Sequence, residues 1–406
     1  MASLHNLLGK ACYCDKNFSK ALIYLNKALE ERQSLPETCK NKHYMIAESC
    51  YDLARLYYAI TDYSGAEELF KTALVLFDTN DDSADVRFKK ALASEELALL
   101  YYQTNKHELA AEMYAEALEI FSVLAASSPE KYNEYVADVS RRLAGLFCAV
   151  IRHRKTDRYF IPALQTKNFL IEKGGNAFAD YASDVCDLLL RLSGACDNPT
   201  EKFVCEKSFL QNALKDYSDY DKTDFISDMY FYSKPFDMSY IGRLCEKSLS
   251  VYEDLAKSNP EAYEGNVAEV LNLTGEFCTL TEKYDQAFKA FESAEKLLTK
   301  FIDQKNGYAD IALASTMCNK AYLFLQTGKS EAIEYYSKAI RTYEDFNNKN
   351  RGAFDNEIAR TLCSLGNAYA KMSDRNNALN CYSESIRLYL KLYAKSPKAF
   401  IDRVIN

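Results

Sequence analysis

The stretch "EKYDQAFKAFESAEKLL", residues 282–298, places Ala287, Phe291 and Ala294 four and then three positions apart. This spacing puts the three side chains on one face of an α-helix. The same phrase recurs as "TDYSGAEELFKTALVLF" at 61–77, "NKHELAAEMYAEALEIF" at 105–121 and "GKSEAIEYYSKAIRTY" at 328–343. A helical phrase that returns along a chain predicts a protein built from helical repeats.

A small residue twelve positions before the alanine of each phrase sets the period. We call it the marker residue; the pairs are Gly9 with Ala21, Ala54 with Ala66, Ala98 with Ala110, Gly275 with Ala287, and Gly366 with Ala378. Ala144 and Ala321 fit the same ladder, and neighbouring markers within each run lie 44 to 46 residues apart. Two antiparallel helices approach closely only where no bulky side chain intervenes, so these positions predict helix crossings. About nine units of about 45 residues would fill the chain.

The composition supports an all-α protein and excludes several classes. The chain has 406 residues with only 13 Gly and 7 Pro, so its elements are long, and its apolar residues recur at helical spacing. A net charge of -8 argues against nucleic acid as the main ligand, which needs a basic face. The N-terminus lacks the basic region and apolar core of a signal peptide, and no stretch is apolar enough to span a membrane. The 13 Cys form no CxxC pair and no cluster with His, which favours free thiols in a reducing cytoplasm.

Two stretches carry a family resemblance. "SLGNAYAKMSDRNNALNCYSESI" (364–386) and "LLGKACYCDKNFSKALIYLNKAL" (7–29) resemble the tetratricopeptide repeat. The usual repeat has 34 residues, so these units look like the long-helix type, as in kinesin light chain-like and bacterial members. The resemblance implies an α-solenoid superhelix of helix-turn-helix units that acts as a non-catalytic scaffold and binds a protein or an extended peptide in a concave groove.

The regularity of the repeat divides the chain into four parts. We expect regular repeats over 1–150 and 259–395, degenerate repeats with insertions over 151–258, and a truncated or capping helix over 396–406. The phrases "SSPEKY" (127–132), "SNPEAY" (258–263) and "KSPKAF" (395–400) predict helix starts at Pro129, Pro260 and Pro397, with Asn259 as one of the N-caps. The degenerate part holds breaks at Pro162, Gly174, Gly175 and Pro235, and weak units near Leu189 and Met229.

No catalytic or cofactor-binding arrangement is visible. The four His show no metal or triad spacing, and no Gly-rich phosphate loop occurs, so we expect neither enzymatic activity nor a cofactor. The basic cluster Arg152, His153, Arg154, Lys155 and Arg158 is either a solvated helix end or a site for an acidic partner segment.

Family resemblance implies partner-binding positions three before, one after and four after each marker residue. The predicted residues are Asn6, Lys10, Tyr13, Tyr51, Arg55, Tyr58, Glu95, Tyr102 and Arg141. Tyr13, Tyr58 and Tyr102 occupy one slot in three consecutive units, either as partner contacts or as packing between adjacent first helices. Two alternatives to a scaffold remain open: a peptide-responsive regulatory sensor, and the recognition region of a larger multidomain enzyme. We also expect weak self-association through an uncapped end of the array.

Overall fold

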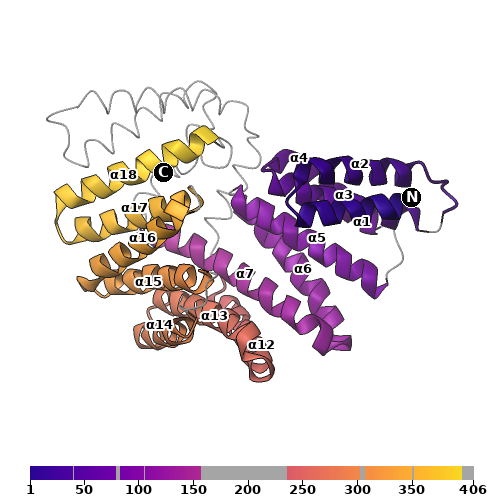
Figure 1. Cartoon of the computed structure of the whole chain (residues 1–406). Helices are drawn as coiled ribbons and strands as arrows, with labels where there is room; N and C mark the ends of the chain where they lie inside the picture. Colours follow the sequence, from indigo (N-terminus) through magenta and orange to yellow (C-terminus); the bar gives the residue numbers. More distant parts are fainter. Residues whose placement is uncertain are drawn as a thin grey trace, which may run out of the picture. The chain divides into compact units, whose positions relative to one another are not determined.

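The computed structural model describes residues 1–39, 41–78, 83–104, 106–156, 236–301, 307–349 and 352–395. Every regular element in these ranges is an α-helix, which confirms the predicted all-α fold (Figure 1). The helices are α1 (Ala2–Cys14), α2 (Phe18–Gln33), α3 (Lys42–Ala59), α4 (Tyr63–Asp78), α5 (Ala84–Gln103), α6 (His107–Ser127), α7 (Pro129–Thr156), α12 (Met238–Ser258), α13 (Pro260–Leu280), α14 (Tyr284–Thr299), α15 (Tyr308–Gln326), α16 (Glu331–Lys349), α17 (Asp355–Lys371) and α18 (Arg375–Lys395).

The chain forms two compact units. Unit 1 comprises Met1–Leu146 and Glu246–Val251, and unit 2 comprises Phe147–Cys245 and Tyr252–Asn406. In unit 1 the helix pairs α1–α2, α3–α4 and α5–α6 are antiparallel hairpins, and each packs on the next along the chain. The described part of unit 2 contains the hairpins α13–α14, α15–α16 and α17–α18 in the same succession. Both units are therefore stacks of helical hairpins.

Within a hairpin, a large side chain of the second helix packs on the marker residue of the first. A Cβ added to Gly9, Gly275 or Gly366 would lie 2.6 Å from Leu25, Phe291 or Tyr382 respectively. The alanines predicted at the crossings are buried; they are Ala21, Ala54, Ala66, Ala98, Ala110, Ala144, Ala287, Ala321 and Ala378. The helix crossings thus lie where the sequence predicts them, and the small residues are needed because bulky side chains cover them.

One turn geometry closes five of the described hairpins. In these the residue seven positions after the marker has a positive φ; it is Gly328 in one and a non-glycine residue in the other four, namely Lys16, Thr61, Glu282 and Ser373. At Glu282 the backbone N–H donates to Thr279 O (3.2 Å), and the N–H of the next residue, Lys283, donates to Cys278 O (2.8 Å). These two hydrogen bonds form a Schellman C-cap, which ends the first helix and reverses the chain.

The predicted helix starts are confirmed where the structure describes them. α7 begins at Pro129 and α13 at Pro260, and the side chain of Asn259 accepts a hydrogen bond from the backbone N–H of Ala262. Several predicted features lie outside the described residues, namely the breaks at Pro162, Gly174, Gly175 and Pro235, the units near Leu189 and Met229, the helix start at Pro397 and the segment 396–406. The number of nine repeats and the four-part division therefore stay predictions.

Candidate partner-binding face

The predicted binding residues all lie on the first helices of unit 1. Asn6, Lys10 and Tyr13 belong to α1; Tyr51, Arg55 and Tyr58 to α3; Glu95 and Tyr102 to α5; and Arg141 to α7. We call the surface formed by these residues and their direct polar partners the first-helix face. Contacts between neighbouring helices join its members from α1 through to α7.

Paired charges link α1 to α3 and α3 to α5. The buried carboxylate of Asp52 accepts a hydrogen bond from Asn6 Nδ2 (2.9 Å) and forms an ion pair with Lys10 Nζ (2.9 Å). One unit further along, Arg55 Nε lies 3.4 Å from Glu96 Oε1. Both pairs occupy the same repeat positions. The cation directly follows a marker residue, and its carboxylate partner stands two residues before the next marker. The repeat therefore imposes a fixed charge arrangement on this face.

Arg55 also joins the aromatic side chains of α1 and α3. Its guanidinium carbon lies 5.4 Å from the ring centroid of Tyr13 and 5.8 Å from that of Tyr51. Such cation–π contacts contribute about 0.5–2 kcal/mol each, depending on how far they are removed from water. Arg55 is thus held by one carboxylate and two rings, and its position is well defined before any partner binds.

The link between α5 and α7 is a cluster of two carboxylates and two guanidinium groups. Arg142 Nε lies 3.2 Å from Glu95 Oε1 and 2.8 Å from Asp138 Oδ2, and Arg141 also pairs with Asp138. Burial raises the pKa of Glu95 to about 7, although Arg142 opposes this shift and Asp138 adds to it. Burial would also raise the pKa of Asp138, but Arg141 and Arg142 outweigh it and the net shift is downward. Near neutral pH, Asp138 is ionised and Glu95 titrates.

The tyrosine stripe, by which we mean Tyr13, Tyr58 and Tyr102, is half-buried. Each ring packs on the first residue of the second helix in its own hairpin: Tyr13 on Phe18 (6.1 Å between centroids), Tyr58 on Tyr63 (5.8 Å) and Tyr102 on His107 (5.9 Å). These contacts orient the rings, which keep part of their surface exposed. A fixed and partly exposed ring has the properties of a contact residue, because little entropy is lost when a partner covers it.

The structure separates the predicted residues by exposure. Asn6 and Tyr51 are buried, so they support the face rather than present surface. The other seven are partly exposed. The charged partners of this face were not predicted from the sequence; they are Asp52, Glu96, Asp138 and Arg142. A signal for three of them exists, because each stands two positions before a marker: Asp52 before Ala54, Glu96 before Ala98 and Arg142 before Ala144.

Unit 2 has polar contacts between first helices at the same repeat positions, but there they involve the side chain of Arg152. Asn319 Nδ2 donates to Asn272 Oδ1 (3.1 Å), which joins α15 to α13 at the register of the Asn6–Asp52 contact. Arg152 Nη2 donates to Asn319 Oδ1 (2.6 Å) and lies 2.7 Å from Glu276 Oε1. Arg152 is therefore bound inside its unit and is not part of a solvated helix end. The side chains of His153, Arg154 and Lys155, and all of Arg158, lie outside the described residues.

Tyr322 follows the marker of α15 directly, a slot that the family register assigns to the groove. Only 3% of its surface is exposed, and the guanidinium of Arg152 lies 4.8 Å from its ring centroid. Tyr322 therefore belongs to the interior of unit 2. Its truncation would test packing rather than partner binding.

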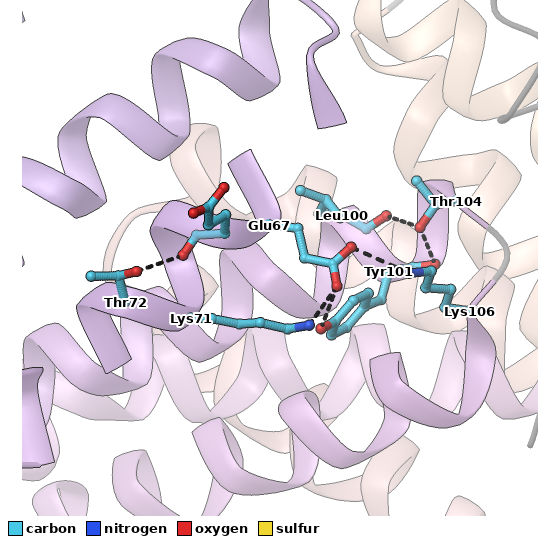
Figure 2. Close-up of polar contacts among 8 residues, drawn as sticks. Glu67, Lys71, Thr72, Leu100, Tyr101, Thr104 and Lys106 are labelled. Atoms are coloured by element: carbon cyan, nitrogen blue, oxygen red, sulfur yellow. Dashed lines mark hydrogen bonds and ion pairs between the residues drawn. The ribbon is translucent and has the colours of Figure 1, made fainter. Parts of the chain in front are cut away.

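A second polar cluster ties the α3–α4 hairpin to the α5–α6 hairpin. Figure 2 shows Glu67 of α4 between two lysines and a tyrosine. Its carboxylate lies 2.6 Å from Lys71 Nζ and 3.2 Å from Lys106 Nζ, and Tyr101 Oη donates to it at 3.3 Å. Burial would raise the pKa of Glu67, but the hydrogen bond from Lys71 and the charge of Lys106 give a net lowering. The contacts of Tyr101 and Lys106 with Glu67 hold the two hairpins together, whereas Lys71 belongs to the same helix as Glu67.

Within the residues that the structure describes, no three His, Cys, Asp or Glu side chains are grouped closely enough to hold a metal ion. The same ranges contain no helix that combines the length and the hydropathy required to span a membrane.

Comparisons with known proteins also indicate a fold of helical repeats. Two family models of the tetratricopeptide repeat match the chain, one over residues 51–125 and one over 359–391. The solved structure of RapI in its apo form is similar over 97% of this chain and 99% of its own, with a TM-score of 0.56 and 10% sequence identity. At this identity the likeness shows the fold alone, which is the helical-repeat solenoid that the sequence predicts.

Two other solved structures align with most of the chain, but at TM-scores below 0.5. BtubC from P. vanneervenii covers 92% of this chain and 92% of its own at 13% identity, with a TM-score of 0.30. Yeast Tom70 covers 99% of this chain and 95% of its own at 15% identity, with a TM-score of 0.25. No curated protein matches the sequence.

Proposed function

We propose that this chain, which carries tetratricopeptide repeats, is a non-catalytic scaffold that binds an extended segment of a partner protein on the first-helix face of unit 1. Tetratricopeptide-type solenoids typically mediate protein–protein interactions through such continuous surfaces. The observation that carries the proposal is the repetition of one half-exposed tyrosine slot and one ion-pair arrangement over consecutive first helices. A ligand that contacts several units in succession must itself be extended.

The charges of the face indicate the chemistry of the partner. Lys10, Arg55 and Arg142 are each paired with a carboxylate of the same face. A partner with many charges of one sign would have to break these pairs, and it would gain little in exchange. A segment with apolar or aromatic anchors and a few charges of either sign would use the tyrosines and leave the pairs in place. We therefore propose this class of segment as the ligand.

We also propose that the chain works in the cytoplasm. The cysteines of the described residues are free thiols, and several of them, such as Cys50 and Cys148, are buried. Free buried thiols are typical of proteins from reducing compartments.

The test is selection of binding segments from a peptide display library, followed by affinity measurements with the selected peptide. The double variant Tyr58→Ala and Tyr102→Ala should lose about 1–4 kcal/mol of binding free energy and keep its helical content. The matched control is Tyr24→Ala, which truncates a half-buried tyrosine on the second helix α2 of the same unit. Equal affinity in the double variant and the control would remove the first-helix face as the site.

The same complex distinguishes a rigid scaffold from a sensor. Binding to a scaffold with a preformed face should leave the radius of gyration from small-angle scattering unchanged. A compaction on binding would instead favour the peptide-responsive sensor.

A further inference from the structure

We propose that copies of this chain associate head to tail, through contact of the exposed face of α18 in one copy with the exposed face of α1 in another. The proposal rests on two apolar surfaces, each of which occupies repeat positions that are covered inside the two units. It is independent of the partner-binding face.

The face of α1 consists of apolar residues that its neighbours in the repeat bury. Leu4 and Leu8 are 53% and 39% exposed, and Ala11 is also exposed. Relative to the marker Gly9, Leu4 stands five positions before, Leu8 one position before and Ala11 two positions after. The corresponding residues in α3 are Ser49, Leu53 and Leu56, and all three are buried.

The hairpin that precedes α3 explains its burial. Leu53 and Leu56 form one apolar cluster with Ala21 and Leu25 of α2, and Leu22 and Leu29 of α2 pack against that cluster. The equivalent surface of α17 is covered in the same manner, because Leu365 and Ala368 share a cluster with Ile340 of α16. A first helix therefore presents an acceptor surface for the second helix of the preceding hairpin, and α1 exposes that surface.

The face of α18 is the complementary element. Leu379 and Ile386, which are 36% and 37% exposed, stand one and eight positions after Ala378. The equivalent residues of α2 are Leu22 and Leu29, and those of α16 are Ile333 and Ile340; both pairs pack towards the next first helix. So α18 exposes the residues that a second helix uses to cover the following hairpin.

The two faces match in spacing as well as in composition. Leu379 and Ile386 lie seven residues apart, and so do Leu4 and Ala11, which is two helical turns in each case. Contact between them would continue the packing of α2 on α3 across a molecular boundary, and it would remove exposed apolar surface from water. Because the two faces differ, each copy added leaves one face free at either end. The assembly then grows beyond a dimer unless it closes into a ring.

The test is sedimentation equilibrium of the 1–406 chain over a range of concentrations, in reducing buffer because Cys14 is exposed. The average mass should rise with concentration and pass the mass of a dimer. Leu4→Glu on α1 and Ile386→Glu on α18 should each abolish the rise. Val75→Glu, at a residue of α4 that is 63% exposed, is the control and should leave the rise unchanged. Circular dichroism checks that each variant keeps its helical content.

A mixture of the two variants gives the decisive result. The Leu4→Glu chain keeps an intact α18 face and the Ile386→Glu chain keeps an intact α1 face. Their equimolar mixture should therefore form a dimer and stop there, although each variant alone is a monomer. A wild-type chain that stays monomeric at every concentration overturns the proposal. So does an Ile386→Glu chain that associates as the wild type does, because α1 would then pair with itself.

Discussion

The ring of Phe291 lies so close to Gly275 that a Cβ built on the glycine would come within 2.6 Å of its Cε1 atom. Phe291 is fully buried, so the ring has no free space into which to move. We predict that Gly275→Ala lowers the free energy of unfolding by about 1–2 kcal/mol, because overpacking exceeds the gain in helix propensity. Gly275→Leu should cost more. Urea denaturation followed by circular dichroism measures both changes.

Gly242 of α12 provides the matched control. It is also a helical glycine, but its Cβ would lie 3.4 Å from the ring of Phe277, which is an ordinary contact. Gly242→Ala should therefore be neutral or stabilise the protein by up to about 1 kcal/mol. If both alanine variants were equally stable, the close packing on Gly275 would not be a real constraint.

The turn residues with positive φ predict a stabilising substitution. Ser373 has φ 63° and directly follows the C-cap Met372 of α17; this conformation costs a residue with a Cβ about 1 kcal/mol relative to glycine. Ser373→Gly should therefore raise the free energy of unfolding by about 0.5–1 kcal/mol. Thermal unfolding would show the increase, and a lower midpoint would contradict it.

Gly328 tests the same backbone cost by the reverse substitution, from glycine to a residue with a Cβ. It holds the equivalent position after α15 with φ 73°, and no atom lies within 4 Å of the place where its Cβ would be. Gly328→Ala would meet no steric obstacle, so any loss of stability comes from the backbone conformation alone. We expect a loss of about 1 kcal/mol.

The fold was predictable because its determinants are local and repeated. The spacing of Ala287, Phe291 and Ala294 identifies one face of a helix. Gly275, twelve positions before Ala287 in the sequence, identifies the helix against which that face packs. Every copy of the phrase repeats the same information, so the register follows even from imperfect copies. The turn conformation was not predictable in this way, because residues as different as Lys16, Thr61 and Glu282 adopt it and none of them carries the glycine signal.

The candidate site was only partly predictable. Repeat register predicts that Lys10, Arg55 and Tyr58 share one face. In the structure Lys10 pairs with Asp52, Arg55 contacts the ring of Tyr13, and Tyr58 packs on Tyr63, while their role in binding stays a prediction. Burial was not predictable from register, because it depends on how neighbouring hairpins pack; Asn6 and Tyr51 are buried at positions where the register suggests surface. Charge pairing was missed since it joins residues far apart in the sequence, such as Lys10 and Asp52, which are 42 positions apart.

The raised pKa of Glu95 predicts that the free energy of unfolding depends on pH in the range between about 4.5 and about 7. Its pKa is about 7 in the folded protein against a reference value of 4.5, so between these values the folded state holds a proton that the unfolded state has lost. The contribution of Glu95 to stability therefore falls as the pH rises from about 4.5 to about 7. Glu95→Gln should remove this contribution, so the urea midpoint should decline less over the same range.

Glu67→Gln is the control for the pH experiment. The pKa of Glu67 is lowered in the folded protein, so its contribution is lost only as the pH falls below its unfolded value near 4.5. The Glu67 variant should keep the wild-type slope between about pH 4.5 and about pH 7. An identical slope in the Glu95 variant and the wild type would show that Glu95 does not hold its proton near neutral pH.

We expect the contacts of Asp52 to stabilise the packing of the α1–α2 hairpin on the α3–α4 hairpin. Its buried carboxylate receives the amide of Asn6 and the ammonium of Lys10, both from α1. Asp52→Ala would leave the buried Asn6 amide without its acceptor, and we expect a loss of about 1–3 kcal/mol in the free energy of unfolding. Lys71→Ala is the control, because this half-exposed lysine of unit 1 pairs with Glu67 and should contribute at most about 1 kcal/mol. Hydrogen exchange should show faster opening of α1 and α2 in the Asp52 variant, with α5 and α6 unchanged. Uniform loss of protection across unit 1 would contradict the local role of Asp52.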